Sequence, residues 1–262
     1  MQLKTKLGLN VQKPWIYGRI RETHMRSELF DARNMAQTPT QPGISLQHSR
    51  CVKAVISGEL LARQGAMVSY RGSLKIETKG QGVGNFLKRA VTGEGLALMS
   101  VQGQGEMWFA SLAHKCFLID LEPGDGLSIN GRNVVCFDRA LQYEIKLVKG
   151  AGMLGGGLFN SLFTGEGRLA ITCDGDPIVM PVTPALPVFV DSDAIVGWSA
   201  QLQTSIQRSQ GIKSILKGGS GEMFQIAFQG QGFVIVQPSE GPITPQASSG
   251  GTGGMLGNLI GG

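Results

Sequence analysis

The sequence predicts an all-β, single-domain prism or barrel with pseudo-threefold symmetry, built from three repeats of about sixty residues. Three observations carry this prediction: a ten-residue pattern occurs three times, apolar and polar residues alternate within it, and 39 of 262 residues are glycine. Alternation with period two predicts strands that bury one face. Abundant glycine favours turns and bends between strands over helices.

The ten-residue pattern begins at Val68, Val135 and Val196, with offsets of 135 − 68 = 67 and 196 − 135 = 61. The three occurrences share valine at the first position, an aromatic residue at the third and leucine at the seventh: Val68, Tyr70 and Leu74; Val135, Phe137 and Leu141; Val196, Trp198 and Leu202. A period of this length indicates an internal repeat. We expect each occurrence to form one strand with its aromatic side chain directed inward.

The segments outside the repeats have distinct compositions. Residues 1–25 carry five basic residues and one glutamate, which is typical of a leader or an artificial extension and also resembles an organelle transit peptide. We therefore place the β domain at residues 26–241 and a flexible Gly-rich tail at 242–262. Before the first repeat we expect a loop up to residue 47, a strand at 52–57 and a turn at Gly58-Glu59.

Each repeated strand is followed by a Gly-rich loop, a Thr/Ser-Gly-Glu sequence and a second strand. We expect a tight hairpin turn after each second strand, at Gly103, Gly175 and Gly230, and then a returning strand. The third repeat has no continuation, so we expect Val52 to Ser57 to complete it and close the ring. The carboxylates of the three Thr/Ser-Gly-Glu sequences, Glu94, Glu166 and Glu222, are expected at equivalent places, either in turns or as a triad near the axis.

The Gly-rich loops contain apolar residues, which loops normally lack. These residues, with the basic residues beside them, are Phe86, Leu87, Lys88 and Arg89; Leu158, Phe159, Leu162 and Phe163; and Ile215, Leu216 and Lys217. Three interpretations remain open: plugs folded onto the ends of the prism, contact with another protein or a second copy, and shallow insertion at a membrane surface.

Composition disfavours several functions. Residues 1–25 carry a net charge of +4 of the total +5, so the rest of the chain is close to neutral and nucleic-acid binding is not expected. Three histidines are too few for a typical metal cluster, and only His114 and Cys116 lie close together in sequence. We therefore expect no metal, no cofactor and no enzymatic activity. The four cysteines form no C-x-x-C pair, so we expect buried, reduced thiols.

The ordered motifs ARQGAMVSYRG, VTGEGL, NGRNVVCFD, GGGLFNSLFTGEG and FQGQGFVIVQPSE resemble the Altered Inheritance of Mitochondria protein twenty-four family, in its actinobacterial type. The resemblance covers about residues 26–241. It implies a pseudo-threefold β-prism similar to the tryptophan RNA-binding attenuation protein, and it implies no reaction and no catalytic residue. Fungal members are associated with the organisation of the mitochondrial inner membrane.

These observations favour a non-enzymatic scaffold or binding protein that acts through self-association and protein contacts. The alternative is an RNA- or small-ligand-binding module. We expect a homo-oligomer with a further protein partner, in the cytoplasm, with peripheral contact to a membrane as one option.

Overall fold

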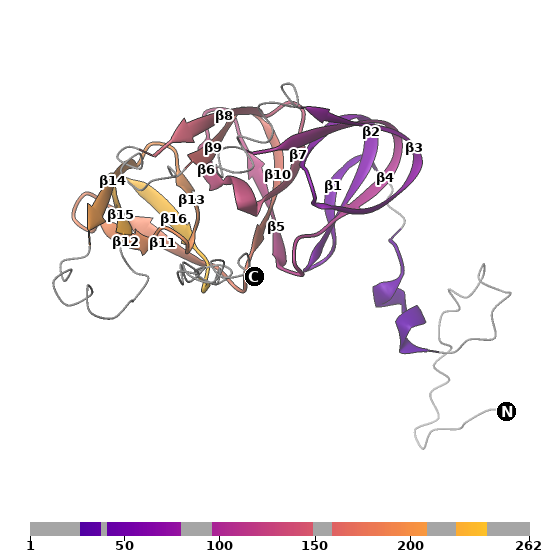
Figure 1. The fold of residues 1–262 in the computed structure, drawn as a ribbon, viewed down its shortest axis with the longest axis horizontal. Coiled ribbons are helices and arrows are strands. Elements are labelled where there is room, and N and C mark those ends of the chain that lie inside the picture. Colours follow the sequence, from indigo (N-terminus) through magenta and orange to yellow (C-terminus); the bar gives the residue numbers. More distant parts are fainter. Residues whose placement is uncertain (1–26, 38–40, 80–95, 149–158, 209–223, 240–262) are drawn as a thin grey trace, which may run out of the picture. The chain divides into compact units, whose positions relative to one another are not determined.

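The computed structural model describes residues 27–37, 41–79, 96–148, 159–208 and 224–239 (Figure 1). The chain divides into two units, residues 1–40 and 41–262. In the first unit, two single turns of 3₁₀-helix follow one another, η1 (Glu28–Phe30) and η2 (Ala32–Asn34). The Ser27 hydroxyl accepts a hydrogen bond from the Leu29 amide and so caps η1.

The second unit is built of strands that pair antiparallel, with one 3₁₀ turn, η3 (Gly131–Asn133). Its strands are β1 (Gly43–His48), β2 (Cys51–Arg63), β3 (Met67–Lys79), β4 (Leu98–Phe109), β5 (Lys115–Leu121), β6 (Gly126–Asn130), β7 (Val134–Asp138), β8 (Gln142–Leu147), β9 (Phe159–Thr164), β10 (Gly167–Cys173), β11 (Ile178–Val182), β12 (Val188–Asp191), β13 (Ile195–Ser199), β14 (Gln203–Arg208), β15 (Phe224–Gln229) and β16 (Gly232–Val236). The all-β fold class predicted from the sequence is therefore confirmed. Among the described residues, no helix is long and apolar enough to cross a bilayer.

The strands form three sheets (Figure 1). The first has the order β3-β4-β2-β7-β10-β5, with β1 paired to β2. The second has the order β11-β16-β13-β6-β9-β8, and the third β12-β15-β14. None of these described sheets closes on itself, so a barrel is not found and the three-repeat prism stays a prediction. The core comprises three clusters, centred on residues such as Met107, Phe137 and Trp198.

The long strands β2 and β4 correct two predicted turns. Gly58 and Gly103 lie inside these strands and opposite one another, instead of in turns. Gly103 still has a positive φ of 119°. A Cβ at this position would lie 2.3 Å from the Ser73 carbonyl oxygen of β3, so glycine is required by close strand approach.

The predicted hairpins at Gly175 and Gly230 are also wrong. β10 pairs with β5 and β7, whereas β11 pairs with β16. Likewise, β15 pairs with β12 and β14, whereas β16 pairs with β11 and β13. The strands on either side of each glycine thus have different partners. The positive φ values of these glycines, 83° and 117°, serve bends at which the chain changes its pairing partner.

The repeated ten-residue pattern forms one unbroken strand only in β3. At the other two occurrences a three-residue turn interrupts the pattern in the same way, so that it is divided between β7 and β8 and between β13 and β14. The expected closure by Val52 to Ser57 is wrong too, because these residues of β2 pair with β1 and β4 in the first sheet.

Candidate functional site

Most of the loop residues predicted to contact a partner lie outside the described residues. These are Phe86, Leu87, Lys88, Arg89, Leu158, Ile215, Leu216 and Lys217. The predicted loop around residues 159–163 is wrong, because Phe159 begins strand β9. Leu162 in this strand is half-buried. For the loop residues beyond the description, the three interpretations stay predictions.

Phe163 is a core residue and not a contact residue. β9 pairs with β6 on one side and β8 on the other, so its alternate side chains face the core. Phe163 is fully buried, and its ring meets that of Phe137 edge to face, with 5.0 Å between centroids. An apolar residue that follows a glycine run has the pattern of a loop insert, because the sequence does not show which strands flank it.

Of the three glutamates predicted at equivalent places, Glu94 and Glu222 lie outside the described residues, so their equivalence stays a prediction. Glu166 is exposed at the bend between β9 and β10.

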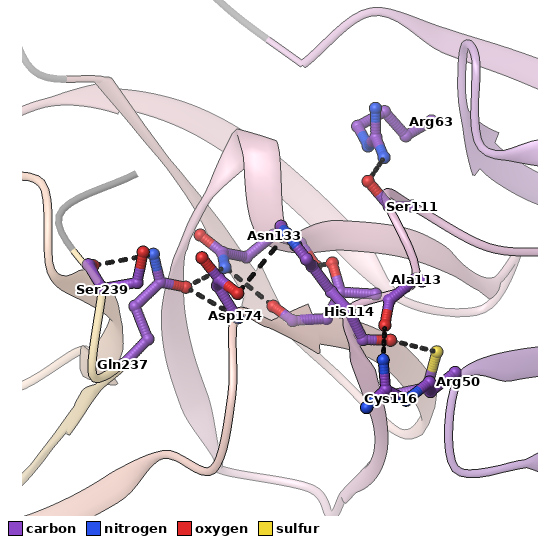
Figure 2. Close-up of polar contacts among 11 residues, drawn as sticks. Arg50, Arg63, Ser111, Ala113, His114, Cys116, Asn133, Asp174, Gln237 and Ser239 are labelled. Atoms are coloured by element: carbon purple, nitrogen blue, oxygen red, sulfur yellow. Dashed lines mark hydrogen bonds and ion pairs between the residues drawn. The ribbon is translucent and has the colours of Figure 1, made fainter. Parts of the chain in front are cut away.

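His114 and Cys116 do not form a nucleophile–base pair. The Cys116 thiol donates to the His114 carbonyl, and the His114 imidazole lies 3.7 Å from Asp174 (Figure 2). Burial raises the pKa of the Cys116 thiol to about 11, with a smaller contribution from Cys51, so the reactive thiolate is scarce at neutral pH. All four cysteines are buried and free, which confirms the sequence prediction for them.

The contacts of Asn133 and Gln237 in Figure 2 hold the end of the described chain in place. The side-chain Nδ2 of Asn133 donates to the Thr172 carbonyl at 2.7 Å and to Gln237 Oε1 at 3.2 Å. Gln237 Oε1 also accepts from the Asp174 amide, and Gln237 Nε2 donates to the Ser239 carbonyl. Asn133 and Gln237 are buried, so this network is structural.

Two short antiparallel junctions link successive groups of strands, β2 with β7 and β6 with β13. Each consists of three residue pairs, Leu60–Asp138, Leu61–Phe137 and Ala62–Cys136 at the first, and Leu127–Ser199, Ser128–Trp198 and Ile129–Gly197 at the second. The side chains of both central pairs are buried. Strand pairing at these positions therefore covers an aromatic residue each time.

β3 and β12 hold the corresponding positions, but among the described strands each pairs on one side only, with β4 and β15 respectively. Gln102 in β4 and Thr164 at the end of β9 serve as equivalent reference points. Tyr70 pairs with Met107, five residues after Gln102, and Phe137 pairs with Leu169, five residues after Thr164. Tyr70 of β3 therefore stands where Phe137 and Trp198 stand at the junctions. Counting residues in the same way along β15 and β9 shows that Phe189 of β12 occupies the position that Ser128 occupies in β6.

Exposure differs between the junctions and these two edges. Val135 and Val196 are fully buried, whereas Val68 of β3 is 59% exposed. Tyr70 is 51% exposed and Phe189 is 47% exposed. The expectation that Tyr70 faces inward, like Phe137 and Trp198, is wrong, because no described strand covers this side of β3.

A chain of charged side chains runs from β3 across β4 to β2. Arg71 pairs with Glu106 of β4, whose other oxygen lies 2.5 Å from Lys53 Nζ of β2. Both cations lie over the Trp108 ring, at 4.9 Å for Lys53 and 5.4 Å for Arg71. This arrangement fixes Arg71 beside Tyr70.

A protein-family profile described as "Mitochondrial biogenesis AIM24" matches residues 45–239. The chain belongs to this family. This confirms the resemblance found in the motifs, while the actinobacterial type stays a prediction. No curated protein matches the chain.

A crystal structure of protein SPYM3_0169 from Streptococcus pyogenes is similar to this AIM24-family chain. The TM-score is 0.60 at 21% identity, over 76% of this chain and 93% of the other. At this identity the similarity shows a shared fold and nothing about function.

The sequence reasoning did not single out the β12 edge of this AIM24-family chain. The segment Val188-Phe189-Val190 is a short run of β-branched and aromatic residues, which is typical of a strand. What distinguishes it is the absence of a second neighbour among the described strands, and the sequence pattern does not report neighbours.

Proposed function

We propose that this AIM24-family chain is a non-enzymatic scaffold that self-associates head to tail, with β12 of one chain pairing with β3 of the next. The observation that carries the proposal is the contrast between buried junction residues and exposed edge residues at corresponding positions. The proposal takes the three groups of strands as internal repeats, each of which offers one edge to the next.

The two internal junctions specify the register of the proposed contact. Phe189 lies opposite Tyr70, as Ser128 lies opposite Trp198 and Leu61 lies opposite Phe137. The neighbouring pairs are Val188 with Arg71 and Val190 with Ser69. An aromatic pair directly opposite one another is among the favourable cross-strand pairs.

Other strand edges support this choice by contrast. β8 and β14 pair on one side only, and so do β5 and β11. The edges of β8 and β14 correspond to one another and are unpaired at both described occurrences. The edge of β5 and β11 is covered at the corresponding part of β2 by β1 of the same chain, so neither kind of edge indicates a second copy. The edges of β3 and β12 correspond to edges that are paired at the two internal junctions. The junctions therefore show what kind of strand covers such an edge, and a second copy of the chain offers that strand.

The expected affinity is modest. Fully burying a valine or phenylalanine side chain contributes about 1.5–3 kcal/mol, and these residues are already half covered. Association costs at least about 4 kcal/mol in lost translational and rotational freedom. We therefore expect assembly in the micromolar-to-millimolar range.

Multi-angle light scattering of the full chain over this concentration range tests the proposal. We expect a mass that rises above the monomer, and a monomer after Val68→Lys, because a lysine on the edge would be buried by pairing. Val179→Lys is the matched control, since Val179 is also 59% exposed but lies on β11. A parent chain that stays monomeric, or equal loss in both variants, would contradict the proposal.

Contact with a further protein or with a membrane surface remains a predicted part of this function. It rests on the basic and apolar loop residues such as Phe86 and Lys88, which lie outside the described residues. The non-enzymatic character is supported by thiols whose pKa values burial raises, including Cys173 at about 12.

A further inference from the structure

A pocket of about 560 Å³ lies between one face of the second sheet and the turn that joins β13 to β14. Its floor is formed by Ser128 of β6, Lys146 of β8 and Asn160 and Leu162 of β9. Trp198 and Gln203 contribute to the wall. The volume falls within the range that small-molecule sites occupy.

The pairing register brings the polar floor residues together. Asn160 lies opposite Lys146 on one side and Asn130 on the other, so Asn160 and Lys146 are on the same face. Leu162, two residues further along β9, lies opposite Ser128 and continues that face as an apolar surface. Polar and apolar groups are therefore adjacent in the pocket.

Asn160 is the residue that points to a ligand. Its side chain is 98% buried and lines the pocket, and within the described part of the chain its Nδ2 has no hydrogen-bond acceptor. A buried donor without an acceptor has lost its hydrogen bond to water and gained none in return, so such groups are rare in stable folds. An acceptor atom that enters the pocket would remove this cost.

The charge in the pocket selects the kind of acceptor. Lys146 is the charged residue among those that line it. Its ion pair with Glu144, at 3.3 Å, joins two side chains that are more than half exposed. Exposed pairs of this kind contribute little, so an incoming anion can compete for the lysine.

We propose that this pocket binds a small organic acid. The carboxylate accepts a hydrogen bond from Asn160 Nδ2 and pairs with Lys146, and the apolar body of the acid lies against Leu162 and Trp198. The described pocket is bounded by β6, β8, β9, β13 and β14 of one chain, so this site does not depend on the proposed self-association.

Benzoate, benzamide and benzyl alcohol are suitable probes, because they share a ring and differ in charge. A fragment of this size in a fitting site reaches a Kd of about 1 mM. We expect calorimetric titration at low ionic strength to show benzoate binding about tenfold more tightly than benzyl alcohol. In ¹H–¹⁵N spectra the Asn160 side-chain amide signals should shift with benzoate.

Two variants test the roles of the floor residues. Asn160→Asp replaces the donor with a repelling carboxylate and should weaken benzoate binding at least about tenfold. Lys146→Gln should weaken it by about three- to tenfold, and because the Lys146 side chain is more than half exposed we expect this variant to fold. Lys75→Gln is the matched control, since Lys75 also pairs with a carboxylate two residues away on an exposed strand, Glu77 at 2.6 Å.

The proposal is overturned by any of three results. These are equal affinity for all three probes, absence of benzoate binding up to about 20 mM, and equal weakening by Lys146→Gln and Lys75→Gln. Should Asn160→Asp fail to fold, the comparison of the two lysine variants decides the matter alone.

Discussion

At the scale of single residues, Lys53 is a buried charge that depends on its ion-pair partner. It is 1% exposed, and a buried ammonium group requires a partner of opposite charge. Glu106 supplies it at 2.5 Å and also accepts from Arg71, so one carboxylate holds two cations. Removal of one partner of a buried pair typically costs about 3–5 kcal/mol, because the other charge is left uncompensated.

Glu106→Gln should therefore destabilise the chain in a pH-dependent way. Burial acts to raise the pKa of Glu106, but hydrogen bonds and charges from Arg71 and Lys53 lower it overall. A lowered folded-state pKa means that the stabilisation is present above the unfolded pKa, about 4.3, and is lost as pH falls through the folded value. Urea unfolding should show a loss of about 3 kcal/mol at pH 7 that shrinks as the pH falls below the unfolded pKa and the carboxylate becomes protonated.

Glu77→Gln serves as the control, because Glu77 and Lys75 are both exposed. Such a pair contributes about 0–1 kcal/mol, so this variant should unfold close to the parent at every pH. A Glu106→Gln penalty that is independent of pH would show that the carboxylate charge is not what stabilises Lys53.

At the scale of elements, the close antiparallel pairing of β3 with β4 depends on glycine residues. A Cβ at Gly103 would lie 2.3 Å from the Ser73 carbonyl oxygen, and one at Gly105 would lie 2.4 Å from the Arg71 carbonyl oxygen. Backbone atoms cannot move aside as flexible side chains do. The close approach of these strands is thus specified by residues that lack side chains.

Gly103→Ala should destabilise the chain by several kcal/mol more than Gly43→Ala. Both glycines have similar positive φ values, 119° and 124°, so both variants lose about 1–2 kcal/mol to backbone strain. A Cβ at Gly43 meets nothing within 4 Å, whereas one at Gly103 collides with β3. Chemical denaturation measures the difference, and equal costs would show that β3 and β4 separate without penalty.

At the scale of the whole molecule, the two unlike edges make the proposed contact heterologous. A head-to-tail contact extends into a ring or a filament, whereas a contact between like edges stops at a dimer. The edges lie on opposite sides of the unit formed by residues 41–262 (Figure 1). In the proposed assembly one chain therefore contacts two others at once.

A mixing experiment distinguishes these assemblies. Val68→Lys leaves the β12 edge intact, and Phe189→Lys leaves the β3 edge intact, so each variant alone should be a monomer. Their equimolar mixture should form a dimer and nothing larger, because each chain retains one usable edge. Light scattering at matched concentration measures this, and a mixture that stays monomeric would argue against head-to-tail pairing.

The sequence by itself determined the strand character of the chain, the burial of its cysteines and its family. These depend on local patterns, such as the period-two alternation of Leu74 and Ile76 with polar residues in β3, and on the order of motifs. Glycine positions were also identified, although Gly103 serves a close strand approach in place of the expected turn.

Only the tertiary structure decided which strands pair. Val68 and Val135 have the same local pattern, but Val135 is fully buried and Val68 is 59% exposed. The difference arises because β7 lies between β2 and β10, whereas β3 pairs with β4 alone among the described strands. Likewise, only the strand pairing places Asn160 opposite Lys146, which makes these two residues the polar groups of the proposed binding site. Alternation specifies which face of a strand is apolar, but the neighbour that covers that face comes from a distant part of the chain.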